Sequence, residues 1–156
     1  MSTQAKPGSF SISSKAFEQN GRIPRQYTGD GENRSPPLEW KLVPSGTRQL
    51  ALVCHDPDAP MPGGFTHWVV YGIPPDANGI PEGGGKNFVE GLNSMGRPGY
   101  MGPAPPRGHG IHHYNFRLYA LGDGPALKPN LGREALLDAV GNRVVGETLL
   151  VGTYER

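Results

Sequence analysis

Residues 48–55 read RQLALVCH, and no other run of the chain predicts a β-strand as clearly. Its apolar side chains fall on both alternating faces, which is typical of a central strand covered on both sides. The run continues directly into residues 56–60 (DPDAP). These residues must form a loop, because two prolines fix φ and remove backbone N–H donors. The sequence therefore predicts a buried strand that ends at an acidic, proline-rich loop.

Two more buried strands are expected further along the chain. Residues 66–73 (THWVVYGI) are rich in β-branched and aromatic side chains and stop at Pro74. Residues 111–121 (IHHYNFRLYAL) follow a strand period. Alternation places one set of side chains on one face, namely His112, Tyr114, Phe116, Leu118 and Ala120. The other face then carries His113, Asn115, Arg117 and Tyr119.

Weaker patterns predict the remaining elements. We expect a weak strand over residues 10–17, a short strand over 38–40 and a last strand over 144–154, with Gly146 as a candidate bulge. Residues 20–37 and 76–110 are rich in Gly and Pro and are expected to be loops. A loop as long as the second is usually functional or mobile.

One helix is expected, over residues 132–139 (GREALLDA). Asn130 is a candidate N-cap, and Gly141 or Asn142 is a candidate end. The helical period places five apolar residues on one side, namely Leu131, Ala135, Leu136, Ala139 and Val140.

These elements together predict a mainly β protein, an antiparallel β-sandwich with one or two short helices. The sequence has frequent turn signals and lacks the βαβ alternation of a Rossmann-type sheet. At 156 residues the chain fits one domain with one core, so residues 1–156 are predicted to form a single domain.

Composition excludes several classes of partner. Lys and Arg number 15 against 14 Asp and Glu, which gives a formal net charge of +1 and no electrostatic case for nucleic acid or an anionic membrane. The single cysteine, Cys54, cannot form an intrachain disulfide and is expected to be an inert core thiol. The N-terminal MSTQAKPGSF lacks the apolar core of a signal peptide, and no run approaches the roughly 20 residues of a membrane span. We expect a soluble, cytoplasmic protein without membrane insertion.

Acids, histidines and a tyrosine gather in two windows, residues 56–67 and 99–114, which hold four of the five histidines. Imidazoles, a phenol and backbone N–H groups can donate to an anion, and carboxylates can orient the donors. We therefore expect an anion-binding pocket formed by Asp56, Asp58, His67, His112 and Tyr114. His109 and His113 are weaker candidates.

Each of these residues also has an ordinary structural interpretation. An aspartate in DPDAP can cap its own turn, and His67 can be a satisfied core histidine. Tyr114 can be a core tyrosine whose hydroxyl bonds to backbone. Residues 102–108 (GPAPPRG) are stiffened by three prolines and can form either a pocket wall or a plain surface loop.

Other chemistries have less support. His67, His112 and Asp56 could form a facial metal triad, but there is no HExxH motif and no cysteine pair. Residues 91–96 (GLNSMG) have one residue too many for the G-x-S-x-G nucleophile motif, and EGGGK at residues 82–86 lacks the spacing of a P-loop. We expect no metal, no cofactor and no enzymatic activity. The alternative is a hydrolase that uses a pocket His/Asp pair.

Four motifs, in this order, resemble the phosphatidylethanolamine-binding protein (PEBP) family, which includes the Raf kinase inhibitor proteins, and especially its short prokaryotic branch. They are IPRQYTGDGENRSPPLEW, TRQLALVCHDPDAP, FTHWVVYGIP and GYMGPAPPRGHGIHHYNFRLYAL. The resemblance implies a β-sandwich whose surface pocket binds phosphate, phosphorylethanolamine-like anions or carboxylates. Carried over by motif, the pocket uses Asp56, Asp58, His67, His112 and Tyr114, with a wall from Gly102, Pro103, Pro105 and Pro106.

The chain departs from the family pattern at three places. The usual H-R-Y is His112-His113-Tyr114, so a titratable histidine replaces an arginine. The segment 61–66 is short, and the chain stops just past Tyr154, so the C-terminal helix of mammalian members should be absent and the pocket more open. The resemblance also implies a homodimer and allows a protein partner, a kinase or a protease. The sequence thus predicts a small binding protein for a phosphate-type or carboxylate anion.

Overall fold

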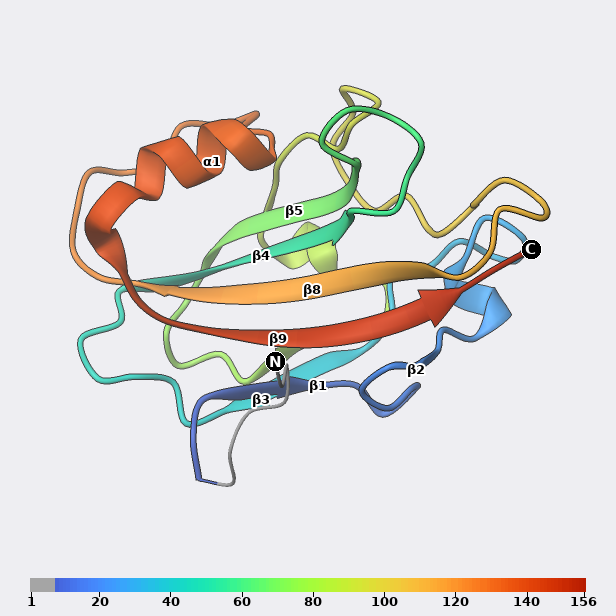
Figure 1. The fold of residues 1–156 in the computed structure, drawn as a ribbon. Coiled ribbons are helices and arrows are strands. Elements are labelled where there is room, and N and C mark those ends of the chain that lie inside the picture. The colour runs from blue at the N-terminus through green and yellow to red at the C-terminus, as the bar shows by residue number, and fades with distance from the viewer. Residues whose placement is uncertain (1–7) are drawn as a thin grey trace.

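Two β-sheets form the body of the protein, and the computed structural model describes residues 8–156 (Figure 1). The larger sheet has the strand order β2-β9-β8-β4-β5-β7, and the smaller has the order β1-β3-β6. All pairs are antiparallel except β2 with β9. The strands are β1 Ser11–Ser13, β2 Gly21–Arg22, β3 Leu38–Lys41, β4 Gln49–Asp56, β5 Phe65–Ile73, β6 Gly79–Ile80, β7 Val89–Glu90, β8 His112–Leu121 and β9 Val144–Tyr154.

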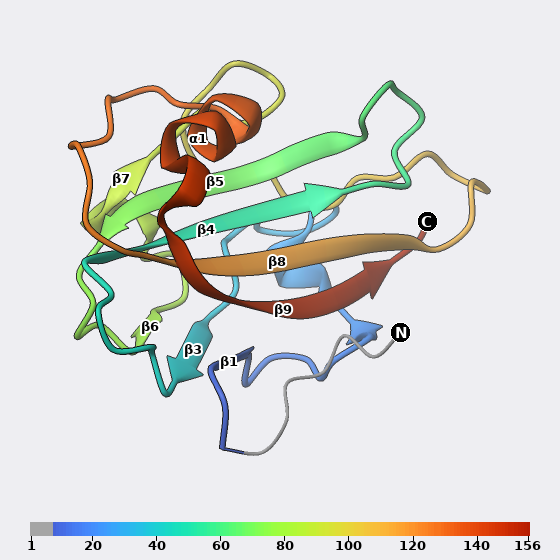
Figure 2. The ribbon, with the colours of Figure 1, turned by 60° about the vertical axis from the view of Figure 1, so that its left-hand side comes forward.

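The layers enclose apolar side chains on both faces of the larger sheet. The small sheet lies under one face, and the helix α1 (Arg133–Val140) lies over the other (Figure 2). Between the sheets the buried cluster includes Trp40, Leu52 and Phe116, and beneath α1 a second cluster includes Val53, Leu136 and Val140. This arrangement confirms the predicted antiparallel β-sandwich with few helices, and it explains why the run 48–55 is apolar on both faces.

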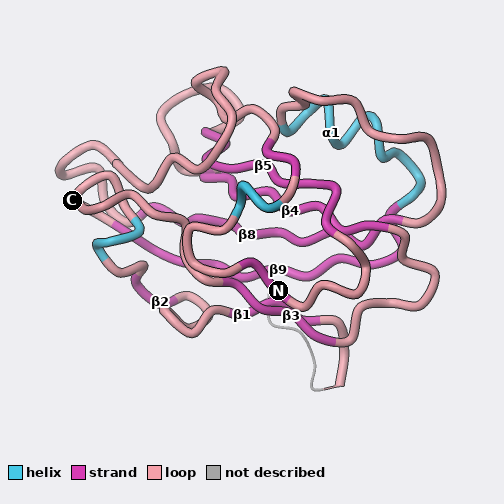
Figure 3. Tube along the Cα trace, turned by 180° about the vertical axis from the view of Figure 1, so that it is seen from behind, coloured by secondary structure: helices cyan, strands magenta, loops and turns pink. Residues whose placement is uncertain are grey.

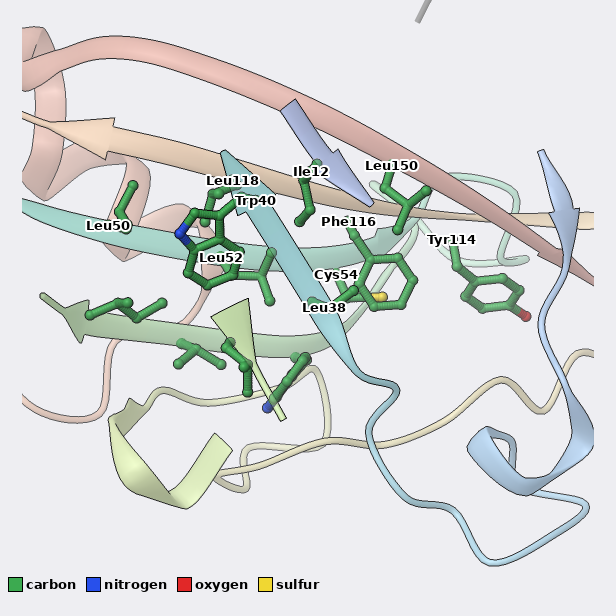
Figure 4. Close-up of a cluster of buried hydrophobic side chains, with 14 of the residues drawn as sticks. Ile12, Leu38, Trp40, Leu50, Leu52, Cys54, Tyr114, Phe116, Leu118 and Leu150 are labelled. Carbon is green, nitrogen blue, oxygen red and sulfur yellow. The ribbon is translucent and has the colours of Figure 1, made fainter. Parts of the chain in front are cut away.

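The core between the sheets ends at Tyr114. Figure 4 shows this tyrosine at one end of the cluster, with its hydroxyl directed away from the other labelled side chains. The alternation predicted for β8 is confirmed, because His112, Tyr114 and Phe116 are buried whereas His113 is exposed. Cys54 lies within the same core, as expected for an inert thiol, and burial raises its pKa.

Some local predictions differ from the structure. Asn130 does not cap the helix, because it adopts φ +62° and Gly132 stands at the N-cap. The predicted end at Gly141 is confirmed. Only Leu136 and Val140 of the predicted apolar side are buried, and Ala135 and Ala139 are exposed.

The segments expected to be loops also contain short elements. Residues 20–37 hold β2 and the 3₁₀ turn η1 (Arg25–Tyr27), and 76–110 hold β6, the 3₁₀ turn η2 (Gly85–Asn87) and β7 (Figure 3). The predicted bulge in the last strand is confirmed beside Gly146: Gly146 pairs with Ala120 and Val144 with Leu121, so Val145 is the extra residue. Residues 1–7, on which the expectation about a signal peptide partly rests, lie outside the described residues.

Candidate functional site

A small cavity opens where β4 ends and where β5 and β8 begin, at the end of the sandwich that also carries the end of β9 (Figure 1). Its volume is about 220 Å³. Its walls come from these strand ends and from the two loops that join β4 to β5 and β7 to β8. The lining residues are Asp56, Ala59, Pro60, Met61, Phe65, His67, Met95, Met101, Gly102, Ala104, Pro105, Pro106, His112 and Tyr114. Seven of the nine residues predicted for the site therefore lie in one cavity wall.

A β-bulge turns His67 into this cavity. Cys54 pairs with Trp68 and His55 pairs with Thr66, so His67 is an extra residue on β5 without a partner on β4. A bulge of this kind re-aims a side chain. As a result His67 lines the cavity while the adjacent Trp68 is packed in the core between the sheets.

The tautomer of His67 is set by a backbone carbonyl. Its Nδ1 lies 2.5 Å from Met101 O, and because a carbonyl only accepts, Nδ1 carries the hydrogen. Every buried polar side-chain atom in residues 8–156 has a hydrogen-bond partner. Nε2 has none in that range, so it must be reached from the cavity. Burial lowers the pKa of His67, so the ring is neutral near pH 7 and Nε2 is an acceptor. This differs from the expectation that His67 donates.

A buried carboxylate orients the second histidine. Asp56 Oδ2 lies 2.6 Å from His112 Nδ1, and both side chains are almost fully buried. Asp56 Oδ1 accepts the backbone N–H of Asp58 at 2.7 Å. Asp56 therefore has both of the roles predicted from the sequence: it caps its own turn, and it orients a histidine through Nδ1. The Nε2 atom of His112 is left for the cavity side, where it meets His109 Nδ1 at 2.6 Å.

Asp58 points away from the cavity. Its Oδ2 accepts the backbone N–H of His113 at 2.8 Å and lies 2.7 Å from His113 Nδ1. Partial burial by itself would raise the pKa of Asp58. The hydrogen bonds from His113 outweigh this effect, so the pKa of Asp58 is lower than its usual value. The pair joins the loop after β4 to the start of β8. His113, at the position where the motif resemblance implied an arginine, thus braces this loop.

Tyr114 places a phenol in the cavity. Its ring lies 5.1 Å from the His67 ring, edge to face, and 6.5 Å from the His112 ring. Its hydroxyl has no partner within residues 8–156, so it too must be reached from the cavity. Burial raises the pKa of Tyr114. The hydroxyl therefore keeps its proton and can donate it in a hydrogen bond.

The glycine-proline wall is held by the loop before β3. Gly102 N donates to Asn33 Oδ1 at 2.7 Å, and a Cβ on Gly102 would lie 2.6 Å from Tyr27 O. Only glycine permits this close approach. The Pro103 carbonyl accepts from Gly29 N at 2.8 Å, and Pro103 is buried outside the cavity lining. Of the wall residues that the resemblance implied, Gly102, Pro105 and Pro106 line the cavity.

Sequence reasoning missed an apolar rim and one histidine. Phe65 and the methionines Met61, Met95 and Met101 come from separate parts of the chain. Nothing in the type or spacing of these residues indicates that they would line one cavity. His109 was only a weak candidate, because its contact with His112 depends on the turn at residues 106–109. Histidines three residues apart beside a strand start are the signal that could have singled it out.

The charge of the cavity is unusual for an anion site. No Lys or Arg is among the lining residues that the structure describes, and Asp56 is the lining carboxylate. Residues 8–156 contain no cluster of three His, Cys, Asp or Glu side chains suited to a metal ion. The same range has no helix with the length and apolar character of a membrane span. A ligand in the cavity would therefore meet two imidazoles, a phenol and the apolar rim.

The sequence that forms this fold and cavity matches a known family of binding proteins. Residues 13–155 match the family model described as phosphatidylethanolamine-binding protein. The chain belongs to this family, as the motif resemblance implied.

Relatives and solved structures agree with this assignment. A UPF0098 protein of Methanothermobacter thermautotrophicus is 46% identical over 153 residues, which cover 94% of this chain and 99% of the relative. A putative lipoprotein, LppC of Mycobacterium tuberculosis, is 40% identical and is matched over 94% of this chain and 72% of its own. The crystal structure of a putative PEBP homologue of Chlamydia trachomatis superposes with a TM-score of 0.89 at 34% identity, covering 95% and 98% of the two chains. Escherichia coli YbcL, a member of the mammalian PEBP family by its description, gives 0.87 at 28%, covering 96% and 99%.

Proposed function

We propose that the protein binds a small oxyanion, of the phosphate or carboxylate type, in the cavity at the ends of β4, β5 and β8. The observation that carries this proposal is the convergence of three polar groups on one cavity of about 220 Å³. These groups are the imidazole of His67, the imidazole of His112 and the hydroxyl of Tyr114. Asp56 orients the ring of His112, and the Met101 carbonyl orients the ring of His67. The family model and the relatives support a binding role for the fold.

The expected affinity is low. Each charge-assisted hydrogen bond contributes roughly 1.5–3 kcal/mol, and two or three of them must offset desolvation of the anion and loss of its freedom. The apolar rim of Phe65 and the methionines adds contact for a small organic group next to the anion.

An NMR titration of the histidine imidazoles tests the proposal. Phosphorylethanolamine and inorganic phosphate are added in parallel at about pH 6 to 7.5, the range in which imidazoles titrate. Selective shifts of His67 and His112, with His55 unchanged as the internal control, are the expected result. A difference between the two probes would show that the ethanolamine end is recognised. Unchanged shifts with both probes would contradict the anion pocket.

A hydrolase is the second candidate function, and one observation favours it. Asp56 Oδ2 lies 2.6 Å from His112 Nδ1 and so orients the imidazole as the partner of a general base would. In the described residues, however, the partner of His112 Nε2 is another imidazole rather than a hydroxyl nucleophile. We therefore propose a non-enzymatic binding protein that needs no cofactor. Turnover of a panel of phosphoesters that disappears in His112→Asn would overturn this.

Three further expectations stay proposals. We propose a cytoplasmic location, a homodimer in solution and a regulatory protein partner of the kinase or protease class. Fractionation of source cells tests the first, and its outcome matters because a mycobacterial relative is named a lipoprotein. Light scattering tests the second, since a mass near 16.7 kDa would show a monomer. A pull-down compared with His112→Asn tests whether any partner binds through the cavity.

A further inference from the structure

We propose that the cavity takes up one proton together with its oxyanion, so that a phosphate monoester dianion is held with one added proton shared between a ligand oxygen and an imidazole. The inference rests on the proposed function and goes beyond it by defining the chemical form of the ligand. Three observations on the geometry and charge of the cavity support it.

The first observation is the pair of fixed tautomers. His67 Nδ1 is committed to the Met101 carbonyl, and His112 Nδ1 is committed to Asp56. In neutral rings both Nε2 atoms are therefore lone pairs. Two acceptors face a ligand whose own oxygens are also acceptors, and such a contact repels until a proton lies between them.

The second observation is the partner that His112 uses in the free protein. Its Nε2 contacts His109 Nδ1 at 2.6 Å, and His109 is an exposed loop residue. When the His112 ring is neutral, the lone pair on its Nε2 accepts this hydrogen bond from His109 Nδ1–H. Removal of His109 by a ligand would leave the lone pair exposed to an anion. The cavity then needs either a protonated imidazole or a ligand O–H.

The third observation is the charge around the two rings. Asp56 at the end of β4 and His55 beside it act on His67, together with His112 of β8. His112 is faced by Asp56, His109, Tyr114 and, at longer range, Asp58. Asp58 is paired with His113, so the carboxylate of Asp56 faces a ligand without a lining Lys or Arg among the described residues. A dianion meets like charge there, and one added proton removes the repulsion.

The proton balance is simple. The proton comes from solvent or buffer, and no covalent bond in the ligand breaks. It resides between a ligand oxygen and an imidazole Nε2, either as P–OH donating to the imidazole or as imidazolium N–H donating to P–O⁻. The neutral hydroxyl of Tyr114 supplies a further donor that needs no added proton.

Calorimetry with methyl phosphate tests the inference on the intact chain. Above about pH 7 this monoester is chiefly a dianion, because its second pKa is near 6. Titrations at about pH 7.5 in two buffers of different ionisation enthalpy should show uptake of close to one proton per site. Between about pH 7.5 and 8.5 the affinity should fall close to tenfold. Equal heats in both buffers and an affinity that does not change with pH would overturn the inference while leaving the proposed function intact.

A matched pair of variants sharpens the test. His67→Gln places an amide, which can donate N–H without titrating, near the position of Nε2. It should bind methyl phosphate with clearly less than one proton taken up and with a flatter pH dependence. His55→Gln, on the opposite face of β4, should keep the wild-type uptake. Full proton uptake in His67→Gln would contradict a role for His67. No binding by the wild-type chain would overturn the proposed function and this inference together.

Discussion

Strands β4, β5 and β8 place histidines on both faces of the larger sheet, and the two faces use them differently. On the cavity face, His67 and His112 each have Nδ1 bonded within the protein and direct Nε2 toward the cavity. On the opposite face, His55 uses both ring nitrogens internally, with Thr66 Oγ1 at 2.9 Å and Gly63 O at 2.8 Å. That face has its own hollow of about 400 Å³, lined by His55, Arg117 and Arg133 among others.

The comparison shows that residue type alone does not mark a binding histidine. The opposite face has the cations that an anion site is expected to use, yet its histidine is fully engaged. The cavity face has no lining cation in the described residues, but the Nε2 atom of His67 and the hydroxyl of Tyr114 have no partner there, and the Nε2 atom of His112 is held by the exposed His109. Adjacent residues provide matched pairs for testing this difference: Asp56 with Asp58, and His112 with His113.

The largest expected difference is in stability, between the two aspartates. Asp56→Ala leaves the buried Nδ1–H of His112 and the N–H of Asp58 without acceptors, and each buried donor left unpaired costs about 1–3 kcal/mol. Asp58→Ala breaks a pair whose side chains are 38% and 49% exposed, and such pairs contribute about 0–1 kcal/mol. Urea unfolding of both variants measures this. Similar losses in the two variants would contradict the distinction between a buried and a surface pair.

The next difference is in anion affinity, between the two neighbouring histidines. Asparagine can keep the Nδ1-like donor while removing Nε2, so His112→Asn preserves the bond to Asp56 and deletes only the cavity-side atom. We expect binding of phosphate to weaken by about ten- to hundredfold, the equivalent of one charge-assisted hydrogen bond. His113→Asn, which keeps the donor to Asp58, should change affinity by less than about twofold. A calorimetric titration in which both variants lose equally would place the site elsewhere.

A smaller effect concerns acid stability and is shared by the two faces. Burial lowers the pKa of His67, and burial followed by Arg133 lowers the pKa of His55. Each histidine is therefore protonated more readily in the unfolded chain, whose pKa is about 6.5, so stability is complete above that pH and declines below it. The slope is at most about 1.4 kcal/mol per pH unit for each proton.

Thermal unfolding at several pH values between about 7.5 and 5 measures this slope. His67→Asn should flatten it more than His55→Asn, because His67 is buried and His55 only half-buried. A free protein whose stability rises on acidification through this range would show that the two rings are not held neutral.

Most of the fold and part of the site could be predicted from the sequence. Strand alternation alone placed His112 and Tyr114 on one buried face of β8, and the apolar run 48–55 located the central strand. These predictions succeed because side-chain direction in a regular strand follows a period of two. The direction of Asp58 could not be predicted, since it depends on the exposed partner His113 that tertiary structure supplies.

His67 shows why regular periodicity is insufficient to predict the lining of the cavity. With the core residue Trp68 directed inward, strict alternation would place His67 on the opposite face with His55. The bulge opposite Cys54 and His55 reverses this, and it arises from pairing with β4 rather than from residues near His67. The motif resemblance placed His67 at the pocket, and the structure finds it lining the cavity. Such a resemblance carries tertiary information that composition and spacing do not.

The smallest expected effect is a gain, and it concerns His109. In the free protein its Nδ1 contacts the Nε2 atom that we assign to ligand binding, so a ligand has to displace it. Removing one hydrogen bond of this kind costs about 0.5–1.5 kcal/mol, so His109→Ala should bind phosphate about two- to tenfold more tightly. His113→Ala, which removes an exposed imidazole on the face of β8 opposite to His112, should show no gain. Weaker binding by His109→Ala would mean that His109 contacts the ligand directly, and the cavity would then use three histidines rather than two.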